Sequence, residues 1–148
     1  MLTTIDNLRE IARRCLSGEP LPSGLSSWLG HSLEEFLSHR RRSIEDALGL
    51  HGPRGGVPWW LEEAMRKRDA ALRELAARFF GDQPVSRQAA NIYRRAIRYA
   101  ESRWLSDRKC SELPPEHRGT PYEWLWQAFK SGAAMPIGDR QLRHILMR

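Results

Sequence analysis

The sequence predicts an all-α fold. Apolar residues recur three or four positions apart along most of the chain, and residues typical of helix starts and stops flank these stretches. No stretch alternates apolar and polar residues for long enough to form a strand. A chain of 148 residues has the size of one domain. We therefore expect a compact single-domain bundle of about five to six helices that covers residues 1–148.

Residues 4–50 are expected to form the N-terminal helices. Three amphipathic stretches occur here, and the second closes into the basic run His39–Arg42. The first and third stretches lie between residues that favour a helix start and a glycine that favours its end, and the second follows a proline break. These boundary residues are Thr3, Thr4, Gly18, Pro22, Ser43, Asp46 and Gly49.

Residues 58–108 are expected to form a basic helical hairpin. Pro58 occupies the position of a first helical residue, and Gly81 ends the first long helix. The second helix is expected to run from Ser86 to Asp107, because its apolar residues keep one helical phase throughout.

Residues 120–148 are expected to form the C-terminal helices. Thr120 and Glu123 have the spacing of a capping box, with Pro121 at the first helical position and Gly132 as the stop. A last helix over 139–147 is expected to close the core.

Positive charge is concentrated in the hairpin. The segment 66–109 holds twelve Lys/Arg and five Asp/Glu, so it carries +7 in a chain whose total is +6. Arginine outnumbers lysine by 21 to 3. A GC-rich genome favours this bias, and so does phosphate recognition, because the guanidinium group binds phosphate bidentately. The segment therefore suits contact with a polyanion or with an acidic protein.

The arginines of the second hairpin helix share the side opposite its apolar stripe. Arg87, Arg94 and Arg98 fall within about 40° of one another, with Arg95 beside them. Arg94 and Arg98 lie about 6 Å apart along the axis, so each can meet a different phosphate. A soluble helix also needs polar residues on its solvent-exposed side. The pattern alone therefore fits either a binding surface for phosphates or an acidic partner, or an ordinary exposed helix side. Arg40, Arg41 and Arg42 form a second candidate patch.

A helix-turn-helix within this segment is disfavoured. Residues 85–90 resemble the opening of such a motif, which needs a tight turn before its second helix. The place for that turn holds Ile92–Arg95, where the apolar phase is unbroken. A short C-terminal turn and helix presenting Arg140, Arg143 and His144 is a second possibility, against which we favour a helix that simply closes the core.

Tryptophans supply the candidate aromatic anchors. Trp124 projects about 160° from the centre of its apolar stripe, so it is the best candidate for an exposed side chain. Trp59 and Trp60 adjoin the Gly-rich loop 51–57, where they either stack on a partner or pack under the loop. The tryptophans on apolar stripes, expected in the core, are Trp28, Trp104 and Trp126.

The sequence lacks a catalytic or metal-binding motif. His31, Glu35 and His39 are spaced four apart on one expected helix flank, but no further ligand accompanies them in a recognisable spacing. The Gly-rich loop lacks the ending of a phosphate-binding P-loop. We therefore expect no enzyme, no metal and no cofactor.

Several single residues carry structural expectations. Cys15 and Cys110 are far apart in the sequence and are expected to be unpaired thiols. His117 is expected at the surface. Arg68 falls inside an apolar stripe, so we expect it to snorkel or, preferably, to form a structural ion pair with a carboxylate such as Glu45 or Asp46.

A series of short motifs extends from Ala47 to Leu146. They are Ala47–Leu48–Gly49–Leu50, Arg68–Asp69, Trp104, Arg118–Gly119–Thr120–Pro121, Leu125–Trp126, Met135–Pro136 and Arg140–Gln141–Leu142–Arg143–His144–Ile145–Leu146. Together they resemble small helical proteins of proteobacterial phages and integrative mobile elements. The resemblance implies a mobile-element setting and no particular activity.

We therefore expect a non-enzymatic, nucleic-acid-associated binding protein, a regulator or nucleoprotein subunit whose arginines contact DNA or RNA. The alternative is a protein-binding inhibitor or adaptor, such as an anti-CRISPR-like anti-defence protein, that docks on an acidic or nucleic-acid-binding surface of a host complex. Charged residues within the first turns and the lack of long apolar windows predict a bacterial cytoplasmic protein without a membrane span. The oligomeric state stays open.

Overall fold

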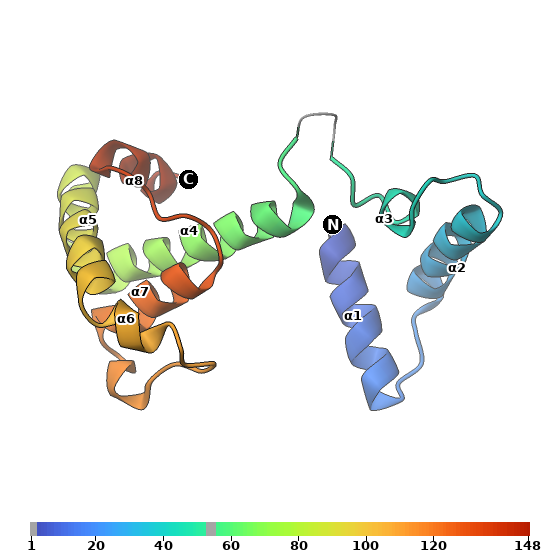
Figure 1. The fold of residues 1–148 in the computed structure, drawn as a ribbon, viewed down its shortest axis with the longest axis horizontal. Coiled ribbons are helices and arrows are strands. Elements are labelled where there is room, and N and C mark those ends of the chain that lie inside the picture. The colour runs from blue at the N-terminus through green and yellow to red at the C-terminus, as the bar shows by residue number, and fades with distance from the viewer. Residues whose placement is uncertain (1–2, 53–55) are drawn as a thin grey trace. The chain divides into compact units, whose positions relative to one another are not determined.

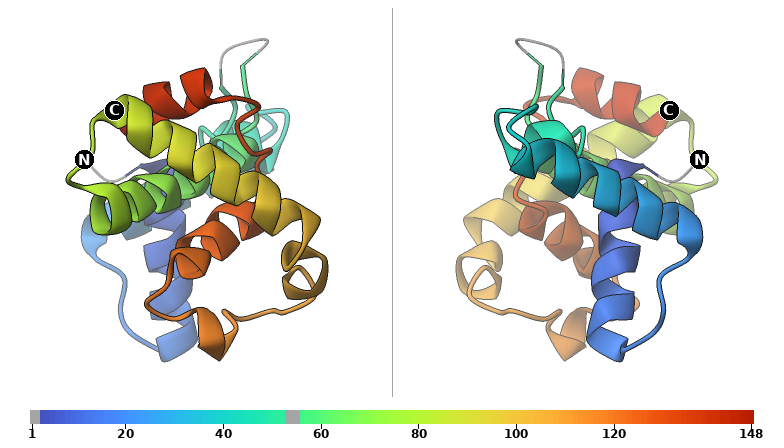
Figure 2. Two further views of the ribbon diagram at one scale, coloured as in Figure 1. Left: turned by 90° about the vertical axis from the view of Figure 1, so that its left-hand side faces the viewer. Right: turned by 90° about the vertical axis from the view of Figure 1, so that its right-hand side faces the viewer.

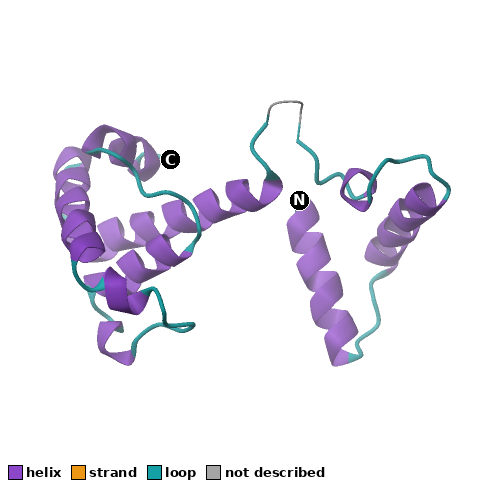
Figure 3. Ribbon diagram, viewed as in Figure 1, coloured by secondary structure: helices purple, strands orange, loops and turns teal. Residues whose placement is uncertain are grey.

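The computed structural model describes residues 3–52 and 56–148. Every regular element among them is helical, which confirms the all-α prediction (Figure 3). Within these residues there are eight α-helices and one 3-10 helix, instead of five or six helices. Two α-helices, α3 (Ile44–Ala47) and α6 (Trp104–Asp107), have only four residues each. The middle of the expected loop 51–57 lies outside the described residues.

The chain divides into two compact units, Met1–Trp59 and Trp60–Arg148, where the sequence led us to expect one bundle. The division falls at the start of α4 (Trp59–Phe80), which the Gly-rich loop precedes in the sequence. Each unit is described by itself.

The first unit contains α1 (Thr4–Ser17), α2 (Ser23–Leu37) and α3 (Figure 1). Thr3 and Asp6 form a complete capping box at the start of α1, and Gly18 ends that helix with φ 70°. His39 also has a positive φ, 58°, directly after α2. His39 therefore lies outside the helix that carries His31, so the regular spacing of these two histidines does not place them on one helix flank.

Few apolar side chains are buried in the first unit. Ile11 is its single buried apolar residue among those described, and Trp28, expected in the core, is half-buried. Leu33, Phe36 and Leu37 are exposed on α2.

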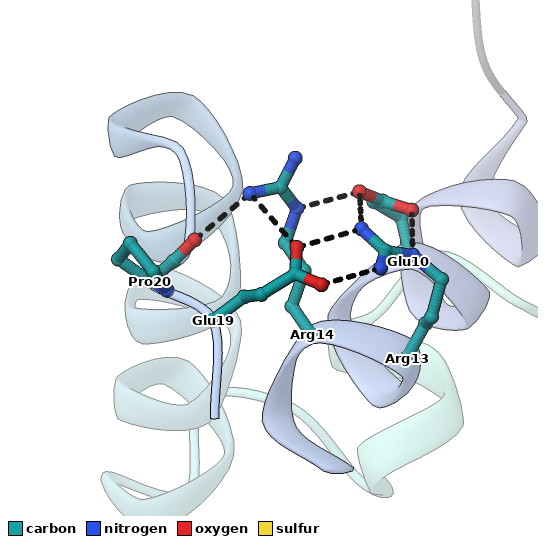
Figure 4. Close-up of polar contacts among 5 residues, drawn as sticks. All are labelled: Glu10, Arg13, Arg14, Glu19 and Pro20. Carbon is teal, nitrogen blue, oxygen red and sulfur yellow. Dashed lines mark hydrogen bonds and ion pairs between the residues drawn. The ribbon is translucent and has the colours of Figure 1, made fainter. Parts of the chain in front are cut away.

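An ion-pair network joins the last turns of α1 to the chain that follows (Figure 4). Glu10 accepts hydrogen bonds from Arg13 and Arg14, and Arg13 also pairs with Glu19 at 2.8 Å. Arg14 donates to the carbonyl oxygen of Pro20 at 3.0 Å. The hydrogen bonds from Arg13 and then Arg14 lower the pKa of Glu10 to about 2. The pKa of Glu19 is lowered as well, mainly by its hydrogen bond from Arg13.

The second unit is built on α4, α5 (Val85–Glu101), α7 (Pro121–Lys130) and α8 (Asp139–Leu146). α5 and α8 lie side by side in both views of this unit (Figures 1 and 2). Their apolar sides meet in one core to which α4 and α7 also contribute. The largest fully buried side chains of this core are Leu72, Leu75, Ile92, Tyr99, Leu125 and Leu142.

α5 ends at Glu101, so the prediction of one helix from Ser86 to Asp107 was wrong at its C-terminal end. Ser102 leaves the helical conformation, with φ −123° and ψ −95°, and its hydroxyl donates to the carbonyl oxygen of Arg98 at 2.6 Å. Side-chain bonds of this kind compete with the helix backbone. After Ser102 the chain turns into α6 and brings Trp104 against the ring of Tyr99. The segment 92–95 is helical, so a helix-turn-helix turn is absent there.

A buried polar network fixes the C-terminal end of α5. The hydroxyl of Tyr99 donates to Asp107 Oδ2 at 2.9 Å, and His117 Nε2 lies 2.7 Å from the same oxygen. His117 belongs to the 3-10 helix η1 (Pro115–His117) and is 1% exposed, so the expectation of a surface histidine was wrong. Burial, followed by the bond to Asp107, raises the pKa of Tyr99.

Arg68 is buried on α4, as its place on an apolar stripe suggested, and it forms the favoured ion pair, although with Asp69 and not with either of the two residues named as examples. Its guanidinium bonds Asp69 at 2.8 Å and the carbonyl oxygen of Ala134 at 2.6 Å. A guanidinium fork satisfies two acceptors at once, which makes the burial of this charge tolerable. Arg68 therefore ties α4 to the segment before α8, and neither Glu45 nor Asp46 takes part.

Candidate nucleic-acid interface

The arginine face of α5, which we define as Arg87, Arg94, Arg95 and Arg98, is exposed to solvent. The opposite side of the helix carries the buried residues Ala89, Ile92, Ala96 and Tyr99. α5 has a single acidic residue, Glu101, at its last position. The four positive charges therefore point outward from a helix whose inner side is fixed by the core, as the helical spacing predicted.

None of these four guanidinium groups is paired with a carboxylate among the described residues. Arg94 donates to Asn91 Oδ1 at 2.8 Å, and Asn91 in turn donates to Gln83 Oε1 at 2.7 Å. Arg95 lies over the ring of Phe80, 5.5 Å from its centroid. Arg94 and Arg95 are thus oriented by neutral groups, which leave their charge uncompensated.

Several other arginines of the chain form ion pairs with nearby carboxylates. On α4, Arg78 pairs with Glu74 at 2.9 Å and Arg66 with Glu62 at 3.6 Å, both at the i,i+4 spacing. Arg13 and Arg14 of α1 enter the network of Figure 4. Some surface arginines of this protein therefore have acidic partners among the described residues, and others, such as Arg40 and Arg140, do not. The arginine face of α5 is distinguished by four arginines without such partners on one side of a single helix.

The second predicted patch, Arg40 to Arg42, lies in the turns after α2 and is exposed. Arg41 pairs with Glu35 at 2.9 Å, and that hydrogen bond raises the pKa of Arg41. Arg40 and Arg42 have no carboxylate partner among the described residues. This patch belongs to the first unit, whereas the arginine face belongs to the second.

Trp124 is half-buried and packs against the core, so the prediction of an exposed anchor was wrong. The guanidinium of Arg78 lies 4.9 Å from the centroid of its ring. A helical projection assumes one covered side, but every residue of α7 from Pro121 to Phe129 is at least half-buried. Trp124 lines a groove of about 430 Å³ together with Lys67, Glu74 and Trp126.

Trp59 and Trp60 at the start of α4 are exposed, at 37% and 57%. Neither side chain is buried, although packing under the neighbouring loop was one of the two interpretations left open by the sequence. The remaining tryptophans follow the prediction more closely, since Trp126 is 8% exposed and Trp104 packs against the core.

A basic groove at the start of α5 was missed as a site by sequence reasoning. It has a volume of about 410 Å³ and is lined by Val85, Ser86, Arg140, Arg143, His144 and Met147. The charged residues of α8 are visible in the sequence, but their position beside the first turn of α5 depends on tertiary packing (Figure 1).

The described residues contain no group of three or more His, Cys, Asp or Glu arranged to hold a metal ion. Cys15 and Cys110 are both free thiols. In the part of the chain that the structure describes, no helix combines the length and the apolar character needed to cross a membrane.

Comparison with known proteins identified no relative of this chain. No family model matches the chain, and neither a curated protein nor a solved structure matches it significantly. The fold and the surface described above are therefore the basis of any functional assignment.

Proposed function

We propose that this protein is a non-enzymatic, cytoplasmic nucleic-acid-binding protein that contacts phosphates through the arginine face of α5. The observation that carries the proposal is the gathering of four exposed arginines, without carboxylate partners among the described residues, on one side of a single helix: Arg87, Arg94, Arg95 and Arg98. Four exposed, uncompensated guanidinium groups on one helix create a strongly positive surface, and phosphate is the ligand that their planar fork fits.

The spacing along α5 supports contact with several phosphates. Arg94 and Arg98 are about 6 Å apart along the axis, and Arg87 lies about 10 Å before Arg94. These contacts read no base edges, so the binding we propose depends on the backbone and is largely independent of sequence.

The test replaces Arg94, Arg95 and Arg98 with alanine and measures retention of duplex DNA, single-stranded DNA and RNA over a salt series. Loss of three phosphate contacts makes the negative slope of log K against log salt less steep by about 2.7 on duplex DNA. The matched control replaces Arg108, Lys109 and Arg118, which are exposed outside α5, and removes the same charge. Equal loss in both variants, or unchanged retention in the first, would contradict the proposed face.

The exposure of Trp60 favours a second candidate, a protein-binding inhibitor or adaptor of mobile-element origin. A large aromatic side chain in water is a typical anchor at an interface, and the arginine face would then meet an acidic surface of a host complex. This candidate predicts no direct binding of nucleic acid and a stable complex recovered from host extract, which Trp60→Ala weakens.

A further inference from the structure

The basic groove, lined by Val85, Ser86, Arg140, Arg143, His144 and Met147, concentrates positive charge at one end of α5. On α8 the residues Arg140, Arg143 and His144 share one side, while Leu142 and Ile145 on the other side are buried against the core. All three basic side chains are exposed, and none has an ionic or hydrogen-bonding partner among the described residues. The groove is therefore a basic hollow whose charged side chains have no protein partner among the described residues.

The first turn of α5 adds hydrogen-bond donors to the same hollow. Arg87 and Gln88 direct their backbone N–H groups to the carbonyl oxygen of Pro84, at 2.9 and 3.0 Å. The N–H groups of Val85 and Ser86 come before them and have no acceptor within the helix. No side chain caps this end, and the first turn contains no acidic residue. The positive end of the helix dipole therefore adds to the charge of the two arginines.

Carboxylates do not compete for these cations within the groove. The acidic residues nearest in sequence, Asp82 and Asp139, are both exposed, and neither lines the hollow. Two guanidinium groups, an imidazole, a serine hydroxyl and backbone N–H donors are all suited to the oxygen atoms of one tetrahedral anion. A carboxylate ligand has only two oxygens and would use fewer of these donors.

We propose that this groove binds a backbone phosphate of the nucleic acid, and this inference rests on the proposed function. The groove lies directly before Arg87, the first member of the arginine face. A strand whose phosphates follow the arginine face reaches the groove at the N-terminal end of α5. The groove then adds a phosphate contact at the N-terminal end of α5 to those made by the arginine face.

Two measurements on the full-length protein test this inference. The first follows the ring resonances of His144 and the amide resonance of Ser86 by NMR during titration with inorganic phosphate. The second is the salt dependence of DNA retention. The variant Arg140→Ala/Arg143→Ala is compared with Arg108→Ala/Arg118→Ala, which removes two exposed charges beyond the other end of α5, about 25 Å along its axis. Circular dichroism checks that both variants keep their helices.

We expect phosphate to shift the resonances in the native protein and in the control, but not in the groove variant. The negative slope of log K against log salt becomes less steep by about 1.8 in the groove variant and changes less in the control. No shift and an unchanged slope would overturn the groove while leaving the arginine face intact. Shifts with an unchanged slope would assign the groove to free phosphate and overturn its role in nucleic-acid binding. If the native protein retains no DNA or RNA, the proposed function fails and the backbone-phosphate inference fails with it.

Discussion

Removal of the Asp107 carboxylate is expected to destabilise the second unit strongly. Asp107→Ala leaves the hydroxyl of Tyr99 and Nε2 of His117 without the acceptor that each now contacts, at 2.9 and 2.7 Å. These two side chains are 0% and 1% exposed, so bulk water does not reach them in the native structure. Each buried group that loses its partner costs about 1–3 kcal/mol. We therefore expect a loss of about 4 kcal/mol in the free energy of unfolding.

A matched variant separates the network from the general effect of truncation. Tyr99→Phe removes one donor but leaves Asp107 bonded to His117, so we expect a loss of about 2 kcal/mol. In the double variant Tyr99→Phe/Asp107→Ala the hydroxyl that Asp107→Ala leaves unsatisfied is absent. The double variant should therefore cost less than the sum of the two single variants.

Urea unfolding followed by near-ultraviolet circular dichroism measures these differences. The signal is suitable because Tyr99 contacts Trp104, Tyr122 and Phe129, with ring centroids 6.0, 5.8 and 5.2 Å away. A cost below about 1 kcal/mol for Asp107→Ala, or strict additivity in the double variant, would refute the view that these hydrogen bonds hold α5 to α6 and η1.

Two further predictions concern pH. The pKa of Glu10 is lowered in the folded chain, so its contribution to stability is complete above the unfolded value of 4.5 and disappears as the pH falls toward about 2. The hydrogen-exchange protection factors of the last turns of α1 should fall in that range, and Glu10→Gln should weaken this dependence and leave the part that Glu19 contributes. The pKa of Tyr99 is raised, so the neutral form is favoured in the folded state and stability is lost as the pH rises above the usual range of tyrosine. Absorbance at alkaline pH should show one tyrosine that ionises only on unfolding, and Tyr99→Phe should abolish that step.

Helix positions were predictable because they depend on local patterns. Thr3 caps α1 as expected, and Thr120 caps α7 by accepting from the N–H of Tyr122. The carboxylate of Glu123 reaches the N–H of Gly119 instead of that of Thr120, a detail that depends on the turn before the helix. The end of α5 was not predictable from phase alone, because Ser102 breaks the helix while the apolar spacing continues.

The candidate site was predictable only in part. The outward direction of the arginine face follows from helical spacing, and the sequence shows that Glu101, three positions after Arg98, is the one acidic residue a turn away from it. The burial of His117 depends instead on contacts with Tyr99 and Asp107, which are 18 and 10 positions away. Trp124 was misplaced because α7 is covered on more than one side. The basic groove required the packing of α8 against the start of α5.

The arginine face also contains no lysine, although the chain has three, at Lys67, Lys109 and Lys130. Acetylation acts on lysine amines, and guanidinium groups do not lose their proton in proteins. The charge of this helix is therefore permanent: enzymes that acetylate lysine cannot remove it, and a change in cellular pH cannot titrate it. Binding at this surface would therefore be controlled by factors outside the helix itself, such as ionic strength, a competing polyanion or the amount of protein present.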